Sequence, residues 1–194
     1  MKAPDTRLKM PPWVPSLVKK EARRWYEDNI EAGWTAEAAM IIRLATDDRM
    51  KQVWEERCIQ ASPEGARALF SEAVFAASHC RVSSRAELEN ERTILMTMAE
   101  RLRRDAISAD YLNQAATYYE ERAANFADAF RDPMTVDRDT GDPDARAFAI
   151  VLTAKCRELF GRPRHESVRI MASVAFEREI PLGGIKGWAA AKVG

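Results

Sequence analysis

Residues 84–131 read SRAELENERTILMTMAERLRRDAISADYLNQAATYYEERAANFADAFR, and this stretch decides the fold class. Ser84 followed three residues later by Glu87 forms a capping box, the sequence signature of a helix start. Apolar residues then recur at helical spacing in two successive runs. The first run is Leu88, Leu95, Met98 and Leu102, and the second, from about Ser108 to Arg131, is Leu112, Ala115, Tyr119, Phe126 and Phe130. Two long amphipathic helices in succession predict an antiparallel helical hairpin.

Helix signals continue on both sides of this hairpin. Four further hydroxyl residues stand where helix N-caps are expected: Ser16, Thr35, Thr46 and Ser62. Gly33 and Gly161 follow the ends of predicted helices, where glycine commonly terminates a helix. Strong helix formers dominate the composition, and runs of β-branched residues are nearly absent. The sequence therefore predicts an all-α fold, an irregular multi-helix bundle around the long hairpin, with no significant sheet.

Prolines and charge mark the predicted domain limits. Pro4, Pro11, Pro12 and Pro15 exclude regular structure from the first fifteen residues, so residues 1–15 are expected to form an extended arm. Residues 16–194 are expected to form a single helical domain. Within it, residues 132–144 read as an acidic loop, and residues 162–194 as a C-terminal helical pair attached as an appendage.

Composition places the chain among ordinary globular proteins. It has 194 residues with 30 basic and 30 acidic side chains, which cancel to a net charge of zero. The three cysteines are an odd number at wide spacing, which argues against a disulfide framework. No apolar run approaches the length of a membrane span, and the N-terminal residues lack the apolar core of a secretion signal. These features predict a soluble, cytoplasmic protein without membrane contact.

Motifs that would carry catalysis or bind a cofactor are missing from the sequence. His79 and His165 lack the Glu-x-x-His spacing of metal-binding helical bundles. No nucleophile elbow, phosphate-binding loop or dinucleotide fingerprint is present. We therefore predict no catalytic, cofactor-binding or metal-binding residue and no cofactor. A pocket inside the bundle, lined by groups such as His79 or Tyr118, is kept as an alternative that would make the protein an enzyme or a small-molecule binder.

The C-terminal segment offers the one specific functional hypothesis. A helix from about Glu166 to Phe176 and a second helix from about Leu182 resemble a helix-turn-helix arrangement. Four basic residues are the candidate phosphate contacts: Arg162, Arg164, Arg169 and Lys186. Phe176 occupies the tight turn where glycine is preferred, which weakens the match. Two aromatic residues near the ends of the chain, Trp13 and Trp188, are candidate interface residues.

Two short stretches resemble a known group of proteins. They are LATDDRMKQVW at residues 44–54 and LFGRPRHESV at residues 159–168. The chain is similar there to small uncharacterised bacterial helical proteins, some of which lie in prophage-like regions. The resemblance covers about a tenth of the chain and implies a bacterial, prophage-associated accessory protein, but assigns no activity to any residue.

Three functional hypotheses follow. The leading one is a non-enzymatic protein–protein interaction or accessory module that binds a protein partner or self-associates, because catalytic groups are missing and charge is divided between a basic head and tail and an acidic middle. The second is a DNA-binding or regulatory protein that uses the C-terminal helices. The third is an enzyme or small-molecule binder with a pocket in the bundle.

Overall fold

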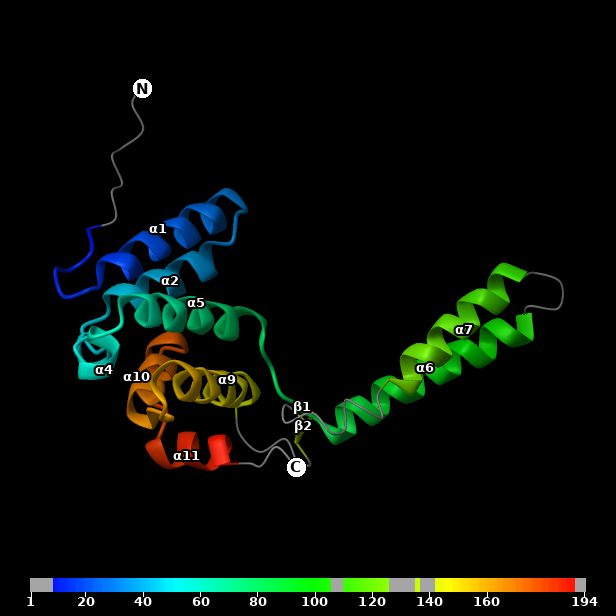
Figure 1. The fold of residues 1–194 in the computed structure, drawn as a ribbon. Helices are drawn as coiled ribbons and strands as arrows, with labels where there is room; N and C mark the ends of the chain where they lie inside the picture. Colours follow the sequence, from blue (N-terminus) through cyan, green and yellow to red (C-terminus); the bar gives the residue numbers. More distant parts are fainter. Residues whose placement is uncertain (1–8, 106–109, 126–134, 137–141, 191–194) are drawn as a thin grey trace, which may run out of the picture. The chain divides into compact units, whose positions relative to one another are not determined.

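The computed structural model describes residues 9–105, 110–125, 135–136 and 142–190. These ranges hold ten helices and two strands of two residues each, which confirms the predicted all-α class. The chain divides into two compact units (Figure 1). The first comprises Met1–Arg81 with Asp144–Ala190, and the second Val82–Pro143 with Ala191–Gly194. No described helix combines the length and apolar character needed to cross a membrane.

The N-terminal half of the first unit is a series of helices joined by short turns. These helices are α1 (Ser16–Glu31), α2 (Thr35–Thr46), α3 (Met50–Trp54), α4 (Arg57–Gln60) and α5 (Pro63–His79). α1 packs against α2 and α5, and Gly33, with φ of +80°, makes the turn between α1 and α2. Ahead of α1, Val14 is buried and Trp13 packs against the core, so the described end of the arm lies on this unit.

The C-terminal helices complete the core of the first unit. They are α9 (Pro143–Phe160), α10 (His165–Ala175) and α11 (Leu182–Ala190). α10 packs against α2, α3 and α11, and eight of its eleven residues are buried. Trp54, Phe70 and Phe148 are the largest side chains of this core, with the rings of Trp54 and Phe70 6.4 Å apart. α10 is thus a central helix of the core, buried on nearly all sides because other helices pack around it.

The second unit contains the predicted hairpin. Its elements are β1 (Ser83–Ser84), α6 (Arg85–Asp105), α7 (Asp110–Ala124) and β2 (Thr135–Val136). α6 and α7 pack antiparallel, and β1 pairs with β2 in parallel, Ser83 opposite Thr135. The predicted Phe126 and Phe130, and the acidic loop apart from Thr135, Val136 and its last three residues, lie outside the described residues.

The helix caps agree with the sequence in part. The capping box is confirmed, since the Ser84 N–H donates to Glu87 Oε2 at 2.8 Å and the Glu87 N–H to Ser84 Oγ at 3.1 Å. Ser62 also caps its helix, accepting from the Gly65 N–H at 3.2 Å. Thr46 does not cap α3, because it is the last residue of α2.

Three of the five cap predictions are wrong, at Thr46, Ser16 and Thr35. The Thr46 hydroxyl donates to the Ile42 carbonyl at 2.8 Å, and hydroxyl side chains bond the preceding turn as readily as they cap the next helix. Asp47 accepts from the Arg49 N–H at 3.0 Å in the turn between α2 and α3, and no side chain caps α3, whose N-cap is Arg49. Ser16 is the first residue of α1 after the N-cap Pro15, and no side-chain bond caps that helix. Thr35 likewise opens α2 without serving as its cap.

The seam between α6 and α7 differs from the predicted one on both helices, since on α7 Ala116 and Ala123 are buried and the predicted Ala115 is half-buried. Leu88, Leu95 and Ala99 of α6 are buried, as are Ala116 and Ala123 of α7. Met98 was expected in this seam, and that expectation is wrong, because its side chain is 45% exposed. Ala99, one residue further and turned by about 100°, takes the inward position instead.

Candidate functional site

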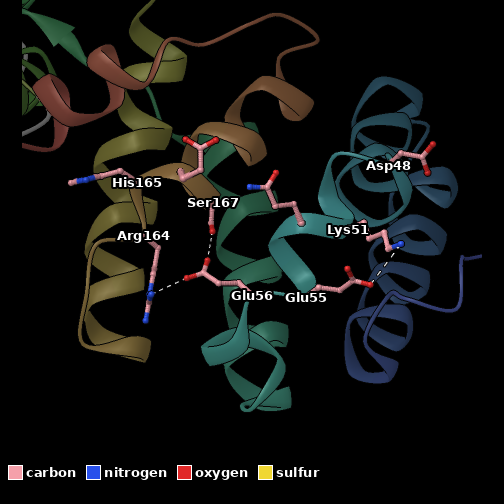
Figure 2. Close-up of a pocket in the computed structure, with 9 residues that line it drawn as sticks. Asp48, Lys51, Glu55, Glu56, Arg164, His165 and Ser167 are labelled. Atoms are coloured by element: carbon pink, nitrogen blue, oxygen red, sulfur yellow. Dashed lines mark hydrogen bonds and ion pairs between the residues drawn. The ribbon is translucent and has the colours of Figure 1, made fainter.

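A polar hollow of about 840 Å³ opens on the surface of the first unit. The residues before α3, the ends of α3 and the start of α10 line it (Figure 2). Its lining carries both signs of charge, with four acidic residues, Asp48, Glu55, Glu56 and Glu166, and two basic ones, Lys51 and Arg164. Six of its nine lining residues are Asp, Glu, Lys or Arg, so the hollow is strongly charged.

Glu56 lines this hollow, and both of its carboxylate oxygens accept hydrogen bonds from neighbouring side chains. The Arg164 guanidinium lies 2.8 Å from Oε1, and the Ser167 hydroxyl donates to Oε2 (Figure 2). The Cys58 thiol adds a weaker bond to Oε1 at 3.5 Å. Arg164 adopts the left-handed conformation, with φ of +46°, which is costly for a residue other than glycine. These bonds hold the start of α10 against the segment before α4.

The ionisable groups around Glu56 are poorly suited to catalysis. Burial, and then the Glu56 charge, raise the pKa of the Cys58 thiol. Burial raises the pKa of Cys156 to about 12, so both thiols stay protonated at neutral pH and are weak nucleophiles. Burial and the nearby Arg157 and Lys186 lower the pKa of His165, whose ring points away from Glu56 (Figure 2). The arrangement supports a structural tie between segments.

Metal ligation finds no support among the described residues. They contain no group of three or more His, Cys, Asp and Glu side chains placed to hold a metal ion. His79, at the end of α5, stacks on the Phe75 ring at 5.0 Å and places Nδ1 3.2 Å from the Phe75 carbonyl oxygen. His79 therefore packs on its own helix.

Of the four basic residues predicted to contact DNA, two form ion pairs with carboxylates and two are exposed to solvent. Arg164 is held by Glu56, and Arg169 pairs with Glu166 at 2.8 Å and Glu179 at 3.3 Å. Arg162, between α9 and α10, and Lys186, on α11, are exposed. Two of the four cations are thus engaged by carboxylates that a phosphate would have to displace, and DNA contact stays a prediction.

The two tryptophans predicted at an interface both lie against the first unit. Trp13 and Trp188 are half-buried and pack against its core. The Trp188 ring covers Gly184, so closely that a Cβ on that glycine would lie 3.6 Å from it. Their role in an interface stays a prediction.

The second unit exposes large apolar side chains on its hairpin. Ile94 is 49% exposed, Met98 45%, Tyr111 70% and Tyr118 56%. We call these four residues the apolar strip. The sequence analysis missed it, although the spacing of residues 87, 91, 94, 98, 101 and 105 is a second helical stripe on α6.

An ion pair between α6 and α7 marks one side of their seam, and the apolar strip lies on the other side. Arg103 pairs with Glu120 at 2.7 Å on one side of the seam. Because successive residues turn by about 100°, Ile94 and Met98 lie on the opposite side of α6. The same rotation places Tyr111 on that side of α7, with Tyr118 at its outer edge.

Arg122, on α7, supports the assignment of Tyr118 to this side of the hairpin. The pKa of Arg122 is raised by its hydrogen bond to the Tyr118 hydroxyl, at 3.3 Å, and to a lesser degree by the charge of Glu91. Glu91 stands one turn before Ile94 on α6, so α6 and α7 approach each other here along the apolar strip.

Searches against protein-family models, curated proteins and solved structures found no match for the chain.

Proposed function

We propose that this protein is an interaction module that binds an α-helical protein surface through the apolar strip of its hairpin. The observation that carries the proposal is the exposure of Ile94, Met98, Tyr111 and Tyr118 on one side of α6 and α7. Contiguous exposed apolar surface marks protein-binding sites, and tyrosine and methionine are enriched there.

The packing of the hairpin explains why a partner would be bound there. Two helices meet along one seam, and here the buried side chains of α7 are the small Ala116 and Ala123, beside the half-buried Tyr119. Helices of a stable bundle cover a wider apolar face than one seam, because each contacts two neighbours. A helical partner laid over the apolar strip would supply a second neighbour for these helices.

The remainder of the described surface favours this function over the alternatives. Both carboxylate oxygens of Glu56 in the hollow are engaged, and burial raises the pKa of the Cys58 thiol that bonds to it, which disfavours a catalytic role. Arg164 and Arg169, the central candidates for phosphate binding, are paired with carboxylates. No described feature favours a second function to the same degree.

Site-specific photo-crosslinking in cells tests this function. A photoreactive amino acid replaces Met98 in the full chain, and a matched control replaces Glu100, which is exposed on the same helix but turned about 160° away. We expect a protein adduct from position 98 and none from position 100. No adduct from position 98 would refute a binding role for the strip.

A further inference from the structure

We infer that the partner of the apolar strip is a second copy of this chain, whose α6 packs antiparallel against the first. This inference rests on the proposed function and names its partner. It is carried by the order of charged and apolar residues along the exposed stripe of α6.

That stripe runs through residues spaced alternately by four and three. Its centre is apolar, with Ile94 and Met98, while Glu91 precedes them and Arg101 follows. Spacing of this kind is the contact face of two helices that pack along their length. Both charged residues are exposed at the margins of the apolar centre.

Charge decides the direction of packing. In an antiparallel pair centred at residue 96, Ile94 lies opposite the second copy's Met98, and Glu91 opposite its Arg101. Two-fold symmetry repeats both contacts, which gives a self-complementary interface. A parallel pair would instead place Glu91 against Glu91 and Arg101 against Arg101, which is unfavourable. The ends of the stripe, Glu87 and Asp105, are both acidic and meet like charges in either direction of packing, so only the four central positions favour the antiparallel pair.

The available area fits a modest dimer. α6 has 21 residues and is therefore about 31 Å long. α7, with 15 residues, is about 22 Å long, so the two helices at about 10 Å width each offer roughly 500 Å² per copy, or about 1,000 Å² in all, the lower limit of specific interfaces. Interfaces of this size are typical of weak, reversible association, so we expect a dimer that dissociates on dilution.

Sedimentation equilibrium of the full chain with charge-swapped variants tests the inference. We expect the unchanged protein to dimerise between about 1 and 200 µM. Glu91→Arg and Arg101→Glu should each weaken dimerisation by at least about tenfold, because each sets two pairs of like charges across the interface. An equimolar mixture of the two variants should regain association, since both cross-pairs are then complementary.

The mixture separates pairing from folding. Glu91→Arg brings a cation near Arg122 within its own chain, but the mixture changes no intrachain contact, so regained association reports pairing between copies. Met96→Lys is a matched control, because Met96 is exposed on the opposite side of α6 and should leave dimerisation unchanged. Ile94→Lys, a second variant independent of the charge swaps, should abolish it.

The outcomes distinguish this inference from the function on which it rests. A chain that stays monomeric at about 200 µM, or a mixture that associates no better than its components, overturns the antiparallel dimer. If position 98 still forms adducts with another protein, the interaction module stands and only the second copy falls. If position 98 forms no adduct at all, both fall.

Discussion

Replacing Gly65 by alanine should destabilise the first unit, although alanine is the better helix former. Gly65 is buried in the first turn of α5. A Cβ there would lie 2.6 Å from the Ser62 Oγ and 2.9 Å from Cε1 of Phe160. Both distances are shorter than carbon atoms tolerate, so the capping hydroxyl and the aromatic ring would have to move.

The magnitude follows from three contributions. Alanine gains up to about 1 kcal/mol over glycine within a helix. Displacing the Ser62 hydroxyl forfeits its bond to the Gly65 N–H, and losing an N-cap costs about 1 kcal/mol. Forcing Phe160 aside adds the cost of overpacking, about 1 to 3 kcal/mol. The free energy of unfolding should therefore fall by about 1 to 3 kcal/mol.

Urea unfolding followed by tryptophan fluorescence measures this effect in the right unit, because all five tryptophans of the chain belong to the first unit. Gly187→Ala on α11 is the matched control, since a Cβ there meets nothing within 4 Å. We expect the control to stabilise the unit by up to about 1 kcal/mol. A Gly65→Ala protein as stable as the unchanged one would refute the steric argument.

Four further outcomes are expected. Ser84→Ala should lower the stability of the hairpin by about 1 kcal/mol through loss of the capping box, measured by amide exchange in α6. Leu95→Ala should cost about 2 kcal/mol or more by the same measurement, whereas Met98→Ala should change stability by less than about 0.5 kcal/mol and weaken only association. The Cys156 thiol should resist alkylation of the native protein at pH 8, read by mass spectrometry. Because its pKa is raised from 9.0 to about 12, its contribution to stability is complete below pH 9 and is lost as the pH rises towards 12. Arg169→Gln should lower the urea midpoint slightly and leave the affinity for duplex DNA unchanged in fluorescence anisotropy, since this arginine serves its carboxylate partners.

Sequence reasoning succeeded where the determinants are local. The capping box at Ser84 and the glycine after α9 act within one helical turn, and both are found as expected, with φ of +70° at Gly161. It failed at Thr46, where two local outcomes are equally compatible with the sequence. A threonine before two aspartates can cap the next helix or bond its own preceding turn, and the packing of α2 decides between them.

The bonds around Glu56 could not be found from the sequence. Ser167 lies 111 residues from Glu56, and a single chain carries no signal for a contact between two such common residues. The same holds for the engagement of Arg164, which sequence reasoning treated as free to bind a phosphate. Pairing between distant side chains depends on how helices pack, and helix packing is decided by the whole core.

The misplacement of Met98 is the most informative difference, because it arises from two overlapping patterns on one helix. Leu88, Leu95 and Ala99 form the stripe that α7 covers. Ile94 and Met98 belong to a second stripe, turned towards solvent, and a single periodicity count merges the two. A helix needs one stripe for one neighbour, and the second stripe, flanked by Glu91 and Arg101 in complementary order, is the feature on which the proposed second neighbour rests. The error in the sequence analysis and the proposed interface therefore have one cause.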